Sequence, residues 1–162
     1  LVLTLPGSEV VVADLKTLAL PVYDGDIEQQ GIPEGVKKLG QLVNGCDALI
    51  ISSPEYNSSI AGSLKNTIDW LSRLKPIPLD KKPILLLGAS PGSLGAIRGL
   101  NVSRAPLEAL GAFVHPGSYG LAKAHEAFTA DGKLVDPALS QRLLSLFQSF
   151  TLYADALNKA FG

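Results

Sequence analysis

The segment Pro54 to Ser58 (PEYNS) gathers an aromatic ring, an amide, a carboxylate and a hydroxyl in one short stretch. It follows the apolar run 48–51 and precedes the amphipathic stretch 64–74. In open α/β sheets, ligands bind in loops at the carboxyl ends of the strands. An irregular loop offers free backbone N–H groups, and an amide such as Asn57 both donates and accepts hydrogen bonds. We therefore predict that this loop binds a flat, heteroatom-edged ligand rather than a metal ion.

A second small-residue loop, Gly88-Ala89-Ser90-Pro91-Gly92, follows the apolar run 84–87. It matches the G-x-S-x-G nucleophile elbow of serine hydrolases. In that elbow the residue after the serine donates its backbone N–H to the oxyanion, and Pro91 has no N–H. Loss of one such donor typically lowers the rate by about 10²–10³-fold. We therefore reject a serine hydrolase and expect Ser90, taken alone, to be a turn residue.

The other reactive side chains lack partners in the sequence. Cys46 is the only cysteine, and we expect it to pack as a small apolar residue. His115 and His125 lie in loop-like sequence without ligand spacing, so no metal site is predicted. Arg98 and Arg104 are expected on a solvated or inter-subunit face, with a grip on the phosphates of a ligand as the alternative.

Composition bounds the class of protein. A chain of 162 residues with 46% hydrophobic content fits one domain with a proper core. The net charge is −1 and no basic stripe is present, which argues against a nucleic-acid partner. The longest apolar runs are too short to span a membrane. A single cysteine and no signal peptide favour a cytoplasmic location.

Apolar runs of strand length alternate with segments of helical spacing. Strands are expected at residues 10–14, 47–52, 84–87 and 112–114, and helices at 34–44, 64–74, 97–110 and 139–161. Residues 21–26 and 75–82 are expected to be loops, and Gly45 to end the first of these helices. Trp70 lies on a helical face and is expected in the core. This alternation predicts a parallel sheet covered by helices on both faces.

The amino-terminal end departs from this alternation. Leu1-Val2-Leu3 resembles the end of a helix, Pro6-Gly7 is expected to form a turn, and a strand follows. In a doubly wound domain, a first strand and most of a first helix would precede that point, roughly 30 residues of a βαβ unit. We therefore expect residues 1–162 to form a single domain that is amino-terminally incomplete.

The run from Pro54 to Asn66 (PEYNSSIAGSLKN), continued by Thr67-Ile68-Asp69-Trp70-Leu71, resembles the signature of the NADPH-dependent FMN reductase family. Further likeness lies in the segment 13–24, with its Leu20-Pro21-Val22-Tyr23-Asp24, and in the Gly88 loop. The likeness spans the whole chain in the right order. It implies a flavodoxin-like, doubly wound, three-layer α/β/α fold with a parallel five-stranded sheet. The family's phosphate-binding loop would precede Leu1.

This resemblance implies an FMN-dependent oxidoreductase that carries electrons from NADPH or NADH to quinones, chromate or azo compounds, with ping-pong kinetics. The flavin carries the chemistry, so no catalytic acid, base or nucleophile is named. The residues implied for FMN binding lie in two loops: Pro54, Glu55, Tyr56, Asn57 and Ser58 in the first, and Ser90 and Gly92 in the second. Family members form homodimers or homotetramers, and residues 64–74 and 73–83 are candidate contact surfaces here.

Two alternatives remain on the same fold. A non-catalytic electron carrier like flavodoxin would dock to redox partners through strong charge complementarity, for which a net charge of −1 gives little steering. A structural or regulatory α/β module would bind no flavin at all. Turnover of NADPH with a quinone separates the enzyme from the carrier, and FMN uptake separates both from the module.

Overall fold

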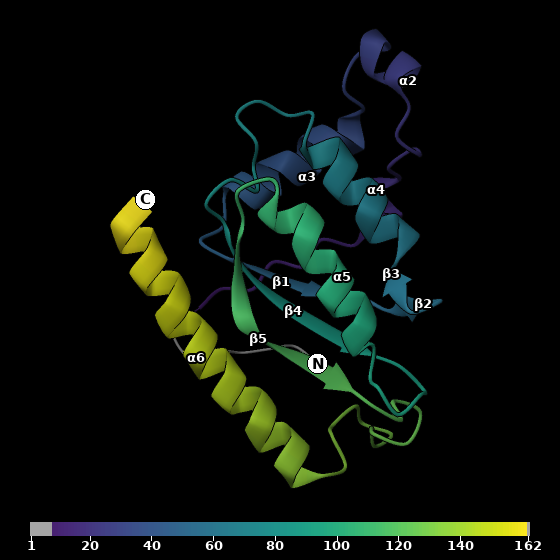
Figure 1. Cartoon of the computed structure of the whole chain (residues 1–162), viewed down its shortest axis with the longest axis vertical. Helices are drawn as coiled ribbons and strands as arrows, with labels where there is room; N and C mark the ends of the chain where they lie inside the picture. Colours follow the sequence, from purple (N-terminus) through teal and green to yellow (C-terminus); the bar gives the residue numbers. More distant parts are fainter. Residues whose placement is uncertain (1–7, 162) are drawn as a thin grey trace.

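The main sheet of the computed structural model, which describes residues 8–161, has three parallel strands in the order β1-β4-β5. They are β1 (Leu49–Ser52), β4 (Pro83–Ala89) and β5 (Phe113–Leu121). A separate antiparallel pair consists of β2 (Glu55–Tyr56) and β3 (Ser59–Ile60). The helices are α1 (Leu15–Leu18), α2 (Gly25–Gln30), α3 (Glu34–Asn44), α4 (Gly62–Leu71), α5 (Ile97–Glu108) and α6 (Pro137–Phe161) (Figure 1).

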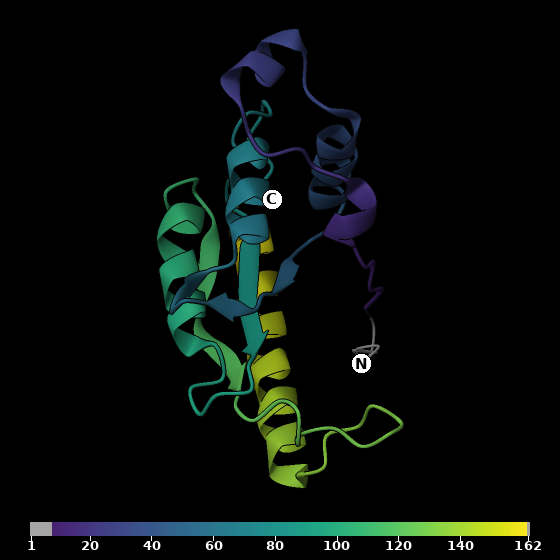
Figure 2. The same cartoon turned by 90° about the vertical axis from the view of Figure 1, so that its right-hand side faces the viewer.

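Successive side chains of β4 point to opposite faces of the sheet, and each face is covered differently. Ile84 and Leu86 pack among apolar residues of α3, α4 and α5. Leu85 packs on the other face against Phe147 and Phe150 of α6. The result is a three-layer α/β arrangement in which α6 runs the length of the sheet (Figure 2). The predicted parallel sheet with helices on both faces is confirmed for these strands.

The predicted helices at 34–44, 64–74, 97–110 and 139–161 correspond to α3, α4, α5 and α6. The expected core position of Trp70 is confirmed, because its side chain is fully buried. Gly45 ends α3 as predicted, but with φ −80° it needs none of the left-handed freedom expected of a C-terminal glycine. Even α6, the longest helix of the described residues, lacks the apolar length that crossing a bilayer requires.

The predicted strand at residues 10–14 is wrong for the described structure. This segment is irregular, and Val10, Val11 and Val12 are 44%, 65% and 84% exposed. A β-strand forms only where a neighbouring strand pairs with its backbone groups, and no strand of residues 8–161 lies beside this segment. The apolar, β-branched composition of this segment favours a strand, but the segment has no partner strand among residues 8–161. The Leu1–Leu3 helix end and the Pro6-Gly7 turn lie outside the described residues.

Strand β5 is much longer than the predicted 112–114. It includes Pro116 and Gly117, two residues that disfavour strand structure. Ile84 pairs with Val114, but Leu86 pairs with Ser118. The pairing thus advances by two residues in β4 and by four in β5, so β5 contains a bulge that includes Pro116 and Gly117. The bulge accommodates both residues while the strand resumes as far as Leu121.

Two short helices were not predicted: α1, where no element was expected, and α2, which begins inside the expected loop 21–26. Asp14 accepts a hydrogen bond from the Lys16 N–H and begins α1. Asp24 accepts one from the Asp26 N–H and begins α2. Both aspartates are N-caps, a signal that was present in the sequence.

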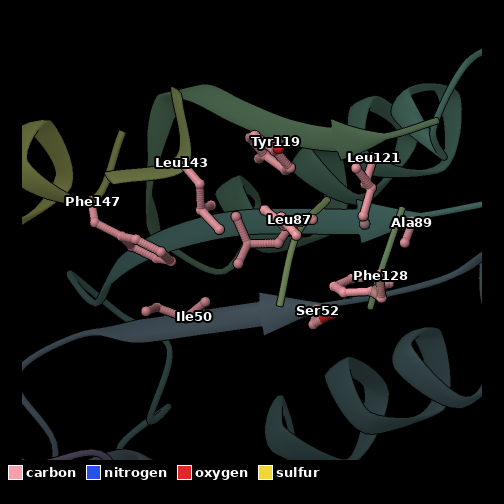
Figure 3. A pocket seen from close by; sticks show the side chains of 11 residues that line it. Ile50, Ser52, Leu87, Ala89, Tyr119, Leu121, Phe128, Leu143 and Phe147 are labelled. Carbon is pink, nitrogen blue, oxygen red and sulfur yellow. The ribbon is translucent and has the colours of Figure 1, made fainter. Parts of the chain in front are cut away.

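The face of the sheet beneath α6 is only partly covered. A cavity of about 330 Å³ lies beside α6, and Figure 3 shows Phe128 across its end, between Ser52 and Ala89. The cavity walls are mostly apolar and include Ile50, Ser52, Leu87, Gly88, Ala89, Tyr119, Leu121, Phe128, Leu134, Leu143 and Phe147. The outer edge of β1 pairs with no strand of the described residues. The predicted five strands are therefore represented by three.

Candidate functional site

The two predicted loops leave the carboxyl ends of neighbouring strands. β1 pairs in parallel with β4 from Leu49↔Ile84 to Ser52↔Leu87. The first loop begins right after Ser52 and the second after Ala89. The Ser53 N–H continues the pairing by donating to the Leu87 carbonyl at 2.9 Å. The sequence-predicted site residues are thus brought to one end of the sheet, where open α/β sheets bind their ligands.

The first loop is a β-hairpin, not the irregular loop expected from its polar sequence. Tyr56 pairs with Ser59 across a turn made by Asn57 and Ser58. Both turn residues have positive φ, 51° and 61°, which is typical of a type I′ turn. The turn aims the backbone outward, and the N–H groups of Asn57 and Ser58 donate to no backbone acceptor among residues 8–161.

The Glu55 carboxylate does not face the open end of the loop. It accepts a hydrogen bond from the Gly99 N–H at 3.0 Å and forms an ion pair with Arg98 at 3.1 Å. The Gly99 hydrogen bond, followed by the Arg98 interactions, lowers the pKa of this carboxyl. Glu55 therefore ties the hairpin to the first turn of α5. Its side chain thus acts as a clamp between the hairpin and the helix, and its part in cofactor binding stays a prediction.

Gly99 allows α5 to approach the hairpin closely. A Cβ at this position would lie 2.8 Å from the Ser59 carbonyl oxygen and 3.1 Å from the Glu55 Cβ. Both distances are shorter than side chains tolerate, so a larger residue would push the hairpin away from the helix. Nothing in the sequence near Pro54 signals Gly99, because it lies 44 residues after Glu55.

The second loop is fixed by the segment that follows β5. The Ser90 N–H donates to the Leu121 carbonyl, and the Ser90 carbonyl accepts from Ala124, each at 3.0 Å. The Gly92 carbonyl accepts from the Lys123 N–H at 3.2 Å. Ser90 is half-buried and Gly92 is exposed. The loop is therefore held in place while its surface stays accessible.

The hydrolase interpretation of this loop stays rejected. The His115 ring contacts Gly117 and Ser149 under α6, and His125 lies 3.1 Å from Glu126. Neither imidazole ring has Ser90 as a partner among residues 8–161, so neither histidine is positioned to act as a base for Ser90. Residues 8–161 contain no cluster of three or more metal-ligating side chains.

Asn66 and Trp70, from the motif's LKN and DW parts, anchor a distant loop. Asn66 accepts a hydrogen bond from the Tyr23 N–H at 2.8 Å and donates to the Pro21 carbonyl at 2.9 Å. Trp70 donates its indole N–H to the same carbonyl at 2.8 Å. A hydrogen bond to Glu28 raises the pKa of the Tyr23 phenol. The motif thus carries structural as well as ligand-loop residues, a division that sequence reasoning missed.

The remaining singled-out residues serve the fold. Arg104, expected on a solvated face, instead reaches the edge of β5 and donates to the Val114 and His115 carbonyls. Cys46 is half-buried, donates to the Val43 carbonyl, and burial raises the pKa of its thiol. The expected packing of Cys46 is confirmed in part, because its side chain is half-buried.

The apolar residues of the predicted contact surfaces face inward. Leu64, Ile68, Leu71 and Leu79 are buried in the core of this chain. An assembly that used α4 would meet its polar side, where Lys65 and Asp69 form an ion pair at 2.7 Å.

The two loops offer hydrogen-bonding groups of the kind that the ring system of FMN requires. The pyrimidine edge of a flavin presents carbonyl acceptors and an N–H donor, and the turn offers the free N–H groups of Asn57 and Ser58 with the Asn57 amide. Tyr56 is 62% exposed, so its ring is free to pack beside a planar ligand. A Cβ on Gly92 would meet only the Ser90 hydroxyl, at 3.8 Å, which leaves open space at that loop.

Comparisons with known proteins identify the family of this chain. The profile of the NADPH-dependent FMN reductase family matches residues 2–126. An NAD(P)H-dependent FMN reductase of Pseudomonas aeruginosa is 35% identical over 155 residues, which cover 94% of this chain and 82% of the relative. A quinone reductase of Escherichia coli is 45% identical over 80 residues, 49% of this chain and 43% of that protein.

A solved structure extends the likeness to the fold. FerB, a flavoenzyme NAD(P)H:(acceptor) oxidoreductase from Paracoccus denitrificans, superposes with a TM-score of 0.74 at 28% identity, covering 90% of this chain and 86% of the other. With the family profile matched over most of its length, the chain is an oxidoreductase that belongs to the NADPH-dependent FMN reductase family.

Proposed function

We propose that this protein holds the isoalloxazine ring of FMN between the Pro54–Ser58 hairpin and the Ser90–Gly92 loop. With it, the enzyme carries electrons from NADPH or NADH to small acceptors. Quinones and azo compounds are supported by the names of relatives, which include a quinone reductase and an NADPH azoreductase of Bacillus. Chromate is the remaining acceptor expected from the sequence.

The observation that carries this proposal is the pair of outward-facing N–H groups at Asn57 and Ser58. Both residues adopt positive φ, which leaves their N–H groups without backbone partners in the described chain. Both residues are exposed, so their N–H groups can bind water or a ligand that replaces it. A planar ligand with carbonyl acceptors along one edge satisfies both donors at once.

Bound FMN supplies hydride chemistry, and the protein supplies binding and electrostatics. The N–H groups of Asn57 and Ser58 orient the pyrimidine edge and favour negative charge there. Glu55 keeps the hairpin against α5, and because Arg98 neutralises its carboxylate, no free negative charge opposes that role. Tyr56, in the hairpin after β1, would cover one side of the flavin ring. The Ser90 loop, which follows β4, would contact the ring from the neighbouring strand.

The complete sheet is proposed to be five-stranded and doubly wound. A strand between the open edge of β1 and residues 10–12 would pair with both, and a right-handed crossover would place its helix beside α6. That helix would fill the cavity next to Ile50 and Phe147. Its amino-terminal end would then lie at the carboxyl end of β1, where it can hold the FMN phosphate. A homodimer or homotetramer is expected from the resemblance.

The test is the visible spectrum of the purified protein after incubation with FMN and removal of free ligand. Bound flavin bands that bleach anaerobically with NADPH, followed by steady NADPH oxidation with a quinone, are the expected result. Double-reciprocal plots should give parallel lines, because both substrates use the same open face in turn.

Two outcomes would contradict the proposal. A protein that stays colourless with excess FMN would be a module without the cofactor. A protein that binds FMN but turns over no quinone with NADPH would be an electron carrier.

A further inference from the structure

Lys123 lies beside the second loop, Gly88 to Gly92, which is proposed to contact the flavin. Its N–H donates to the Gly92 carbonyl at 3.2 Å, and the next residue, Ala124, donates to the Ser90 carbonyl at 3.0 Å. The side chain of Lys123 is exposed. Its φ is +48°, a left-handed conformation that residues with a Cβ rarely adopt. The chain thus holds a lysine in a strained conformation at the edge of the proposed site.

The backbone around Lys123 is rigidly placed. Gly95 and Gly120 lie so close that a Cβ on Gly120 would be 2.6 Å from the Gly95 carbonyl oxygen. The Ser90 N–H donates to Leu121, two residues before Lys123. The backbone of Lys123 is therefore held beside the loop. The position of its ammonium depends only on the conformation of its own side chain.

Two pairs of charged or titratable side chains lie near these loops. Glu55 pairs with Arg98 at 3.1 Å, and His125 lies 3.1 Å from Glu126. Lys123 forms no ion pair with any residue between 8 and 161. Its exposed ammonium is therefore available to an anionic ligand.

We propose that Lys123 binds the anionic group of a planar acceptor that carries a carboxylate or a sulfonate. This inference rests on the proposed function, because the acceptor must lie on a flavin held by the Ser90 loop. Lys123 is then a specificity-determining residue: it favours anionic over neutral acceptors and takes no part in electron transfer. An ammonium on a flexible stem suits this role, since it reaches substituents at different positions on a ring.

The experiment uses the FMN-loaded full chain, with NADPH as donor and two acceptors that differ in one group: 1,2-naphthoquinone and its 4-sulfonate. The variants are Lys123→Gln, Lys123→Glu and Lys123→Arg. Lys37→Gln, an exposed lysine on α3, gives the same change in net charge away from the site. The quantity compared is kcat/KM for the sulfonate divided by kcat/KM for the neutral quinone.

Lys123→Gln should lower this ratio about two- to five-fold, the range of single exposed charge interactions. Lys123→Glu should lower it further, and Lys123→Arg and Lys37→Gln should keep it near the wild-type value. Added salt should shrink the wild-type preference because it screens the charge.

An unchanged ratio in Lys123→Gln and Lys123→Glu, with neutral-quinone activity intact, overturns this inference alone. An equal loss with both quinones also overturns it, because Lys123 would then support FMN binding or folding. If the wild-type protein oxidises no NADPH with the neutral quinone, the proposed function fails, and this inference fails with it.

Discussion

The Glu55 carboxylate accepts a hydrogen bond from the Gly99 N–H at 3.0 Å, across 44 residues of sequence. The bond joins the hairpin after β1 to the helix that follows the β4 loop. Only 9% of the Glu55 side chain is exposed, so water competes little for it. One side chain thereby fixes the position of one proposed flavin loop relative to the other.

Removal of this clamp should weaken FMN binding. Glu55→Ala removes the acceptor for the Gly99 N–H, and we expect the Kd for FMN to rise about ten-fold, as for loss of one charge-assisted hydrogen bond. Glu55→Gln should have a smaller effect, because its amide oxygen still accepts from Gly99. Fluorescence titration of FMN measures both, with Glu34→Ala, an exposed glutamate on α3, as the control. Equal affinity in all four proteins would show that the clamp does not position the flavin loop.

The clamp also predicts a pH dependence with a defined sign. The Gly99 hydrogen bond lowers the Glu55 pKa in the folded protein, from about 4.3 in an unfolded chain. Its contribution to stability is therefore complete above the unfolded value and is lost as the pH falls through the lowered folded value. Between pH 6 and 8 Glu55 should add no pH dependence to stability. Chemical unfolding of wild type and Glu55→Gln checks this: the difference between them should be constant from pH 6 to 8 and shrink only in acid. A difference that changes near neutral pH would contradict the lowered pKa.

Gly99→Ala should separate the hairpin from α5. Alanine normally stabilises a helix interior by roughly 0.5–1 kcal/mol over glycine. Here the new Cβ would lie 2.8 Å from the Ser59 carbonyl oxygen, a backbone atom that cannot move alone. We expect a lower Tm and weaker FMN binding, measured by thermal unfolding with and without FMN.

Gly62→Ala is the matched control for this variant. Gly62 begins α4, and a Cβ there meets nothing within 4 Å. Its Tm should be equal to or above that of the wild type. A Gly99→Ala protein that is as stable and binds FMN as well as Gly62→Ala would rule out the close contact.

Asn66→Ala should destabilise the fold without changing the two loops proposed to bind flavin. It deletes the bonds to the Tyr23 N–H and the Pro21 carbonyl, although Trp70 still donates to the latter. Loss of these partly buried bonds should lower the free energy of unfolding by about 1–2 kcal/mol. Urea unfolding measures the change, and Lys65→Ala, which breaks an exposed ion pair, should cost at most about 0.5 kcal/mol. Similar losses in both variants would show that Asn66 does not anchor this loop.

Local patterns predicted most elements, and they failed where a distant partner decides the structure. The helical spacing of residues 34–44 and the apolar run in β4 depend on nearby residues, and both were predicted correctly. Val10–Val12 has the composition of a strand, yet it is exposed because no described strand pairs with it. Strand β5 was predicted too short, because the bulge that admits Pro116 and Gly117 depends on its pairing with β4.

The candidate site follows the same rule. The strand-loop-helix order predicted where Tyr56 and Asn57 lie, because parallel strands end on one side of a sheet. The hairpin depends on positive φ at Asn57 and Ser58, which a polar sequence does not specify. The partner of Glu55 was not predictable, since Gly99 becomes its neighbour only when α5 packs on the hairpin.

The most direct test is a crystal structure of the protein with FMN bound. Our account predicts the ring between the hairpin and the Ser90 loop, with its pyrimidine edge at about 2.7–3.2 Å from the N–H groups of Asn57 and Ser58. Tyr56 should lie beside the ring and Glu55 should still bind Gly99. A ring found elsewhere, with those two N–H groups still facing solvent, would contradict it.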